Sequence, residues 1–387
     1  MKALSNLRVI DLSQGVAGPH AGMLLAQHGA DVVKVEPLEG DWGRTLGKQY
    51  GSFCAHAIVF NRGKRSIAVD LKSDEGRRIV VDLIARADVV LESYRPGVLK
   101  RLGLSYEDVR AIKPDIIYLS ITGFGQTGPG SGLPATDSII QANSGWMTLH
   151  RDENGRPMRS GIIAIDVMTG LYAFQAIAMA LIARMRTGEG TYIDCSMLQS
   201  AAAFQAAKIL ENYLEDGQPV VSYVPVGVME TSDGYITISA MRDAHYDALC
   251  GILGREDLAR DERFNGRDKR RANKALLMPI LEDEFRKKTS SEWCEALTRA
   301  GVMNARINTY LEFLAEPQVE HAGIVAMVDH GHLGVAPAVN IPGTPALGDD
   351  PAAHRCPDIG EDGDRILAEL GRSRTDIQRL RTAGAVR

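Results

Sequence analysis

The first half of the chain alternates short apolar runs with amphipathic segments. The apolar runs predict buried strands and the amphipathic segments predict helices, in strand–helix–strand order. This order is typical of a parallel sheet with crossover helices on its faces. The expected strands are 7–12, 31–36, 65–72, 88–92 and 115–121, and the expected helices are 20–28, 75–86 and 105–112.

The most apolar stretch, 161–183, is long enough to look like a membrane span. It carries polar side chains and ends in two cations: Asp166, Thr169, Gln175, Arg184 and Arg186. Because charged and polar groups are costly inside a bilayer, we expect a buried helix and no membrane partner.

Asp166 stands where this apolar run passes into the helix, and two interpretations are open. Asp is a favoured N-cap residue, so the side chain is expected to cap the helix. Alternatively, the helix N-terminus keeps the carboxylate ionised for use as a nucleophile. Asp137 also stands at an expected helix start, and capping is the default interpretation there.

The pattern changes after a strand at 191–196 and a helix at 197–214. An Asp-Gly turn predicts a hairpin over 228–239, and helices are expected at 243–253, 268–287 and 290–299. From about 320 the chain is rich in Gly and Pro, with one helix at 361–370 and a polar tail. We therefore expect an α/β protein with a large Rossmann-like parallel-sheet domain (1–215), a smaller α+β domain (225–320) and a C-terminal segment (330–387).

Two loops are candidates for ligand contact. Ser13–Pro19 consists largely of small residues and precedes a helix, where a phosphate or thioester can approach backbone N–H groups. The segment 93–103 leaves a strand end with an aromatic residue and cations, which suits an adenine ring and phosphates. A solvated basic helix start is the alternative for this segment.

A glycine pattern at 123–128 formally matches the dinucleotide-binding motif GxGxxG. The residues after it, from Pro129 to Pro134, cannot open the helix that this motif requires. We therefore expect a glycine-rich loop that allows close backbone approach to a ligand, and no dinucleotide cofactor.

The composition of the chain mainly argues against certain classes of function. A net charge of −5 argues against a nucleic-acid-binding surface. The histidines form one close pair, His330 and His332, so no metal site is expected. The chain begins without a signal-peptide core, and its cysteines are scattered without a CxxC pair, which favours reduced thiols in a cytoplasmic protein. The cysteines are Cys54, Cys195, Cys250, Cys294 and Cys356.

Several ordered motifs resemble those of the class III CoA-transferases, which include formyl-CoA:oxalate and carnitine CoA-transferases and the related α-methylacyl-CoA racemases. The similarity runs from the first strand to about residue 320 and is weaker in the tail. The motifs are Val9-Ile-Asp-Leu, Ala17-Gly-Pro, Gly29-Ala-Asp-Val-Val-Lys-Val-Glu, Asn61-Arg-Gly-Lys-Arg-Ser, Asp70-Leu-Lys, Arg95-Pro-Gly, Gly123-Phe-Gly-Gln-Thr-Gly-Pro and Thr187-Gly-Glu-Gly.

The resemblance implies that Asp166 is the catalytic nucleophile and that an acyl-CoA thioester is a substrate, with no tightly bound cofactor. Asp166 would form a mixed anhydride and then an aspartyl-CoA thioester, with backbone donors from 13–18 and 123–128 at the oxyanions. The residues implied in CoA binding are Val16, Ala17, Leu71, Lys72, Ser93, Tyr94, Arg95, Arg101 and, near the CoA sulfur, Asp137.

The resemblance also implies a homodimer of interlocked chains, with the C-terminal segment returning to the large domain. A racemase or epimerase acting on α-methylacyl-CoA is the alternative function. The racemases carry a His immediately before the aspartate that matches Asp137, and this chain has Thr136 there. The missing base favours the transferase.

Overall fold

The computed structural model describes residues 2–218, 221–330, 333–344, 346–347 and 354–387. The chain divides into two compact units. Unit 1 comprises the residues up to 207 together with 323–387, and unit 2 comprises 208–322. Each unit has its own hydrophobic core and is described by itself.

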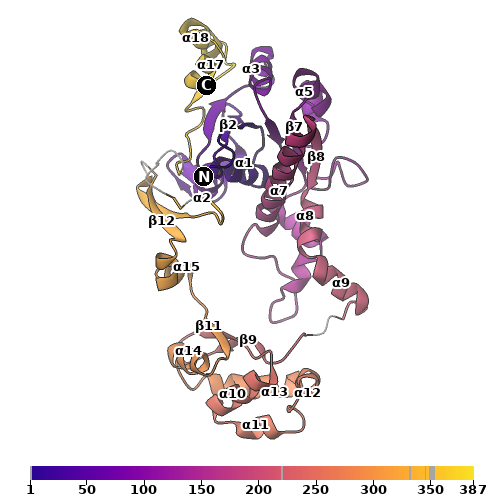
Figure 1. Ribbon diagram of the computed structural model, residues 1–387, viewed down its shortest axis with the longest axis vertical. Helices are drawn as coiled ribbons and strands as arrows, with labels where there is room; N and C mark the ends of the chain where they lie inside the picture. Colours follow the sequence, from indigo (N-terminus) through magenta and orange to yellow (C-terminus); the bar gives the residue numbers. More distant parts are fainter. Residues whose placement is uncertain (1, 219–220, 331–332, 345, 348–353) are drawn as a thin grey trace. The chain divides into compact units, whose positions relative to one another are not determined.

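Unit 1 is built on a six-stranded parallel sheet with the order β5-β2-β1-β6-β7-β8. Figure 1 labels β2, β7 and β8 of this sheet. The chain proceeds outward from β1 to one edge and then from β6 to the other edge, so the order reverses between β1 and β6. Crevices at such a reversal are where parallel sheets bind ligands. The strands are β1 Arg8–Asp11, β2 Asp31–Glu36, β5 Arg65–Ala68, β6 Val89–Glu92, β7 Ile117–Thr122 and β8 Thr191–Ser196.

Helices cover both faces of this sheet, and alternate strand residues point to opposite cores. Ile10 packs in the core that α3, α5, α17 and α18 cover, while Val9 packs in the core that α1, α7 and α8 cover. The helices are α1 Ala17–Gln27, α2 Ala55–Asn61, α3 Asp74–Ile84, α4 Val98–Arg101, α5 Tyr106–Ile112, α6 Asp137–Asn143, α7 Ala164–Thr187, α8 Met197–Phe204, α17 Gly363–Glu369 and α18 Arg374–Thr382. Short elements complete the unit: η1 Trp42–Thr45, η2 Trp146–Leu149 and the pairs β3 Gln49–Tyr50 with β4 Phe53–Cys54 and β12 Val325–Asp329 with β13 Val335–Val339.

Unit 2 is a small α+β unit with the antiparallel order β11-β10-β9. Its core gathers aromatic side chains, among them Phe264, Phe285 and Trp293. Its elements are α9 Ala206–Leu214, which begins just before the unit boundary, β9 Val226–Glu230, β10 Tyr235–Ser239, α10 Asp243–Leu253, α11 Glu256–Arg260, α12 Arg267–Ala272, α13 Lys274–Phe285, α14 Ser290–Arg299, β11 Met303–Arg306, α15 Tyr310–Leu314 and α16 Pro317–His321. The parallel sheet of unit 1 and this smaller antiparallel sheet confirm the expected α/β fold class.

Some boundaries differ from the sequence expectations. The first helix begins at Ala17 and not at residue 20, because Gly18 and Pro19 fit its first turn, where no intrahelical N–H bond is lost. The expected helix 197–214 is two helices that meet at Gln205, and 268–287 is two helices that meet at Asn273.

The C-terminal segment holds more regular structure than the sequence indicates. It contains the β12–β13 pair, and the polar tail contains α18. Asp362 accepts a hydrogen bond from the Ser66 amide at 2.9 Å, and Val386 bridges to Val69. This segment therefore completes unit 1 beside β5.

By length and composition, α7 is apolar enough to cross a membrane. In the structure it packs along α1 and against β7 and β8, which buries one of its faces (Figure 1). Its other face exposes apolar side chains: Leu171, Met179, Ile182 and Met185.

Candidate functional site

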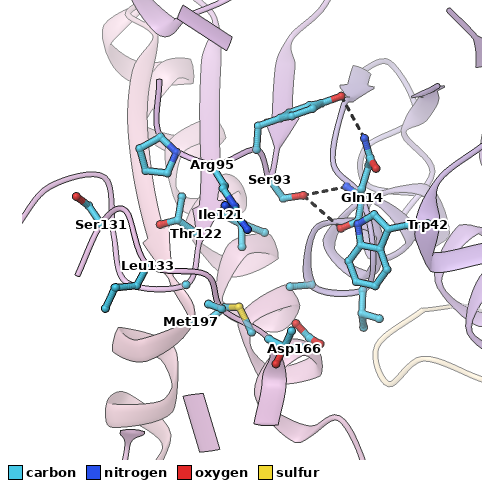
Figure 2. Close-up of a pocket in the computed structure, with 17 residues that line it drawn as sticks. Gln14, Trp42, Ser93, Arg95, Ile121, Thr122, Ser131, Leu133, Asp166 and Met197 are labelled. Atoms are coloured by element: carbon cyan, nitrogen blue, oxygen red, sulfur yellow. Dashed lines mark hydrogen bonds between the residues drawn. The ribbon is translucent and has the colours of Figure 1, made fainter. Parts of the chain in front are cut away.

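A cavity of about 370 Å³ opens at the carboxyl edge of the sheet, at the reversal between β1 and β6. Loops that follow β1, β2, β6, β7 and β8 all contribute to its wall. Figure 2 shows Asp166 at one end beside Met197, with Trp42 and Gln14 on one wall and Leu133 on the other. The lining residues are Gln14, Val16, Ala17, Trp42, Ser93, Tyr94, Arg95, Pro96, Ile121, Thr122, Gly123, Ser131, Leu133, Ala135, Thr136, Asp166 and Met197.

The Trp42 indole, which forms one wall of the cavity, packs directly against the backbone of Gly15. Gly15 has φ +84°, and a Cβ atom there would lie 2.2 Å from Cζ2 of the indole. The Asp41 carboxylate ties the two loops together, because Oδ1 accepts the amide hydrogens of Gly15 and Gly43, both at 2.8 Å. Only glycine at position 15 allows this close approach.

Buried ion pairs support these loops from below. Lys34 Nζ lies 2.8 Å from Asp41 Oδ2 and also donates to the Ser13 carbonyl. Lys64 Nζ lies 2.8 Å from Asp11 Oδ2, and these four charged side chains are fully buried. Removing one member of either pair would leave an unpaired charge in the interior, which is strongly destabilising. The conformation of these loops therefore depends on both ion pairs.

The loops after β1 and β6 are also joined directly. The Gln14 amide donates to Ser93 Oγ at 2.9 Å, and Gln14 Nε2 donates to Tyr94 Oη at 3.3 Å (Figure 2). Below them, the Glu92 carboxyl accepts the Tyr94 amide at 2.7 Å. Burial raises the pKa of Glu92 to about 7.

Asp166 does not cap its helix, which corrects the capping interpretation. It is the third residue of α7, and Ile163 occupies the N-cap position without a side-chain bond. Burial, with a further contribution from the nearby Asp137 charge, raises the pKa of Asp166 to about 7. The start of α7 therefore does not lower the pKa of this carboxyl group, contrary to the expectation that the helix N-terminus keeps it ionised.

Asp137 takes the capping position of α7 from a different helix. It is the first residue of α6, yet its Oδ2 accepts the amide hydrogens of Ile165 at 2.7 Å and Asp166 at 3.2 Å. Gln141 Nε2 donates to the other oxygen at 2.5 Å. This arrangement places a second carboxylate beside Asp166 and accounts for part of its raised pKa.

The start of α1 and the start of α7 are locked together behind the cavity. His20 Nδ1 lies 3.0 Å from the Val167 carbonyl, and burial lowers the pKa of His20 to about 4. The neutral ring donates this hydrogen bond. A Cβ atom on Gly170 would lie 2.6 Å from His20 Nδ1, so the two helices touch without an intervening side chain.

The structure brings together most of the residues implied by the resemblance. Val16, Ala17, Ser93, Tyr94, Arg95 and Asp166 line the cavity. Asp137 lies immediately behind Asp166, whereas Leu71, Lys72 and Arg101 lie outside the lining. Leu71 and Lys72 follow β5, which β2 separates from β1, and Arg101 ends α4 at the exposed surface.

The sequence analysis includes Gln14 only as part of the loop Ser13–Pro19, and it misses Trp42 and Met197 as cavity residues. Met197 directly follows β8, so its place at the carboxyl end of a parallel strand was a usable signal. Trp42 stands in a loop whose course only the fold reveals.

Many backbone donors in the two glycine-containing loops are already used. The amides of Gln14 and Gly15 donate to Ser93 and Asp41, and the amide of Gln126 donates to Asp194 Oδ2. The first amides of α1 have no carbonyl partner within the helix. Ala17, the first residue of α1, is therefore the best-placed backbone donor in the cavity wall.

The described part of the chain holds no group of three or more His, Cys, Asp or Glu side chains that could bind a metal. His332, one of the two neighbouring histidines in the sequence, lies outside the described residues. The carboxylate and the cavity around it define an α/β protein with a ligand site at the switch point of its sheet.

Comparison with known proteins shows which family of α/β proteins this chain belongs to. The chain belongs to CoA-transferase family III, whose family model matches residues 4–363. It is 37% identical over 388 residues to a succinate–glutarate CoA-transferase from Agrobacterium fabrum, covering 95% of both chains. It is 38% identical to the human succinyl-CoA:glutarate CoA-transferase, covering 89% of this chain and 80% of the human one.

A crystal structure of a CAIB/BAIF family protein from Brucella suis has a TM-score of 0.84 and 36% identity, covering 95% of this chain and 99% of that one. The chain is thus a CoA-transferase that uses acyl-CoA and a carboxylate, as the sequence motifs predict.

Proposed function

We propose that this enzyme moves CoA from an acyl-CoA donor to a free carboxylic acid through covalent intermediates on Asp166. The observation that carries the proposal is the position of Asp166 at the end of the cavity that Val16, Ala17, Ser93 and Tyr94 also line. A bound acyl-CoA would fill this cavity and shield an anhydride on Asp166 from water.

The proposed steps balance without a net proton. An Asp166 carboxylate oxygen attacks the thioester carbonyl carbon, the C–S bond breaks, and a mixed anhydride and CoA thiolate result. The thiolate attacks the aspartyl carbonyl carbon, which releases the donor acid as its carboxylate and leaves an aspartyl-CoA thioester. The acceptor carboxylate then repeats these two steps in reverse and regenerates Asp166.

The electrostatics of Asp166 support a nucleophilic role. A pKa of about 7 makes its carboxylate more basic than an ordinary Asp, and half of it is ionised at neutral pH. The first amides of α1 would stabilise the oxyanion that forms at the thioester carbonyl, because they point from a helix N-terminus into the cavity wall.

For CoA we propose a path from this cavity toward the surface. Ser93, Tyr94 and Arg95 would contact the nucleotide end, with Tyr94 against adenine and Arg95 at a phosphate. Three further residues lie outside the cavity and would contact the part of CoA that extends beyond it: Leu71, Lys72 and Arg101. CoA enters as a thioester substrate, and the proposal requires no tightly bound cofactor.

The acids that we propose are small dicarboxylic acids. Two relatives that align over most of this chain are named for succinate and glutarate, or for succinyl-CoA and glutarate. A panel of acyl-CoA donors against succinate, glutarate and monocarboxylic acids, with product CoA esters measured by mass spectrometry, defines the pair.

The mechanism is tested by trapping. Incubation with succinyl-CoA followed by hydroxylamine is expected to modify residue 166 of the wild-type protein, and Asp166→Ala is expected to lose activity by roughly 10⁴-fold or more. Unmodified Asp166 together with retained activity of the Ala variant would overturn the mechanism. Wash-in of deuterium at the α-carbon of a 2-methylacyl-CoA, without any acceptor acid, would instead indicate the racemase.

We also propose a homodimer in the cytoplasm. The exposed apolar face of α7, with Leu171, Met179, Ile182 and Met185, supports a second copy as the covering partner. Light scattering after gel filtration is expected to give twice the chain mass, and Met185→Lys is expected to shift the population toward the monomer. A wild-type monomer at micromolar concentration would contradict the dimer.

A further inference from the structure

Arg62 is a buried cation that forms no ion pair with any described carboxylate. It follows α2, its side chain is 4% exposed, and its Nε atom has no hydrogen-bond partner. Its guanidinium makes one hydrogen bond, from Nη2 to the Val339 carbonyl at 2.8 Å. Among the described residues, no carboxylate forms an ion pair with it, and burial lowers its pKa.

The other buried cations of this protein are compensated. Lys34 pairs with Asp41, Arg44 with Glu36, Lys64 with Asp11 and Arg270 with Asp243, at distances between 2.5 and 2.8 Å. Transfer of an unpaired charge out of water is costly, and proteins normally pair such charges. Arg62 is therefore an exception that calls for an anion from outside the described chain.

Two buried histidines lie near Arg62. His330 and His354 are 6% and 5% exposed, and burial lowers the pKa of His330, on which the charges of Asp329, Arg62 and His354 also act. The Gly63 amide donates to the Arg355 carbonyl at 2.9 Å, which places the segment that begins at His354 beside Arg62. A guanidinium with two imidazoles beside it is a site for a planar oxyanion such as a carboxylate.

This site adjoins the wall that carries Asp166. The ring of Phe60, two residues before Arg62, lies 5.4 Å from the ring of His20. His20 in turn bonds the Val167 carbonyl, next to Asp166, and the Arg62 charge contributes to its lowered pKa. Arg62 and Asp166 are thus linked through one histidine.

We infer that Arg62 binds a carboxylate of the acid substrate, namely the carboxylate of a dicarboxylic acid that does not react with Asp166. The inference rests on the proposed function, and it adds a residue that selects dicarboxylic over monocarboxylic acids. Arg62 offers a fork of donors that matches a carboxylate in two hydrogen bonds. The His330 and His354 rings would add N–H donors at the same site.

The experiment uses the full chain and two readouts. Thermal unfolding is followed with glutarate or with pentanoate, which has the same five-carbon chain but only one carboxylate. Wild-type protein is expected to unfold at a higher temperature with glutarate and to respond little to pentanoate, because a ligand of the folded state stabilises it. Arg62→Gln is expected to lose the glutarate response without unfolding at a lower temperature when no acid is present, because an uncompensated charge is removed.

Kinetics give the second readout. For Arg62→Gln, the KM for glutarate is expected to rise roughly 30-fold or more, the scale on which loss of one member of a buried charge pair acts. The KM for the acyl-CoA of a monocarboxylic acid is expected to stay within about twofold. Arg62→Lys keeps the positive charge but loses the paired guanidinium donors, so its KM for glutarate is expected to lie between those of the wild-type protein and Arg62→Gln. Arg299→Gln, on an exposed side chain of α14, is the matched control and should change neither readout.

Retention of the glutarate response by Arg62→Gln would overturn the inference. An equal response of the wild-type protein to inorganic phosphate and to glutarate would overturn the carboxylate assignment. A fall in unfolding temperature of Arg62→Gln without acid, with the glutarate KM unchanged, would show a purely structural cation. If the wild-type protein transfers no CoA, the proposed function fails, while the unfolding experiment still decides whether Arg62 binds a dicarboxylate.

Discussion

At the scale of single residues, the chemistry depends on how two carboxylates are placed. Asp137 occupies the amides at the start of α7, and Asp166 is left facing the cavity with a raised pKa. A sequence shows both aspartates at helix starts and cannot show that one caps the helix of the other. That assignment depends on the packing of α6 against α7.

This placement predicts a pH dependence. Asp166 reacts as the carboxylate, and its pKa is about 7, so kcat/KM is expected to rise with pH and to level off above about pH 7. Asp137→Asn removes the neighbouring negative charge and is expected to move the midpoint to lower pH, while burial keeps it above the ordinary value of 3.8. The measurement is kcat/KM between pH 5 and 9.

Glu92 provides the control, because burial raises its pKa to about 7 as well. Glu92→Gln is expected to keep the midpoint, whatever it does to the absolute rate. A midpoint that disappears in Glu92→Gln and stays in Asp137→Asn would assign the titration to Glu92.

At the scale of elements, the contact between α1 and α7 fixes the cavity wall. We predict that Gly170→Ala destabilises the protein by about 1–3 kcal/mol and lowers activity, because its Cβ atom would lie 2.8 Å from the Ala17 carbonyl, which is backbone and cannot rotate away. Gly251→Ala, in α10, meets no atom within 4 Å and is expected to stabilise by up to about 1 kcal/mol. Urea unfolding measures the stability of both variants. Equal changes in the free energy of unfolding would contradict the close contact between Gly170 and the Ala17 carbonyl.

The elements also show what a sequence can predict. The strands Asp31–Glu36 and Thr191–Ser196 lie where continuous β-branched or alternating runs place them. The sequence predicts a polar tail where α18 lies, because only Ile377 and Leu380 are buried along this helix. Its Ser373–Asp376 capping box was a signal that could have revealed it.

The cavity was harder to predict than the sheet. Segments that follow five different strands, far apart in the sequence, form it together with Asp166 of α7. The family motifs identified Asp166 and the 93–95 loop, whereas Trp42 depends on its contact with Gly15, which exists only in the folded chain.

At the scale of the whole molecule, the last residues belong to the core of the first unit. Leu380 is buried among strand and helix residues from the start of the chain, including Ile10 and Ile79. We predict that Leu380→Ala costs about 2–5 kcal/mol, as a large-to-small change in a core does. Gln378→Ala, on the exposed side of the same helix, is the control and should change unfolding by less than about 0.5 kcal/mol. Similar effects of both would contradict the burial of the tail.

The divided course of unit 1 has a consequence for synthesis on the ribosome. Residues 208–322 are complete and can collapse on their own core while the ribosome still holds the tail. The sheet face that α3 and α5 cover in part still needs Ile366, Leu380 and Val386 before its core is complete. During that interval the nascent chain presents part of an apolar sheet face, so chaperone contact is expected to last until α18 and Val386 have been synthesised.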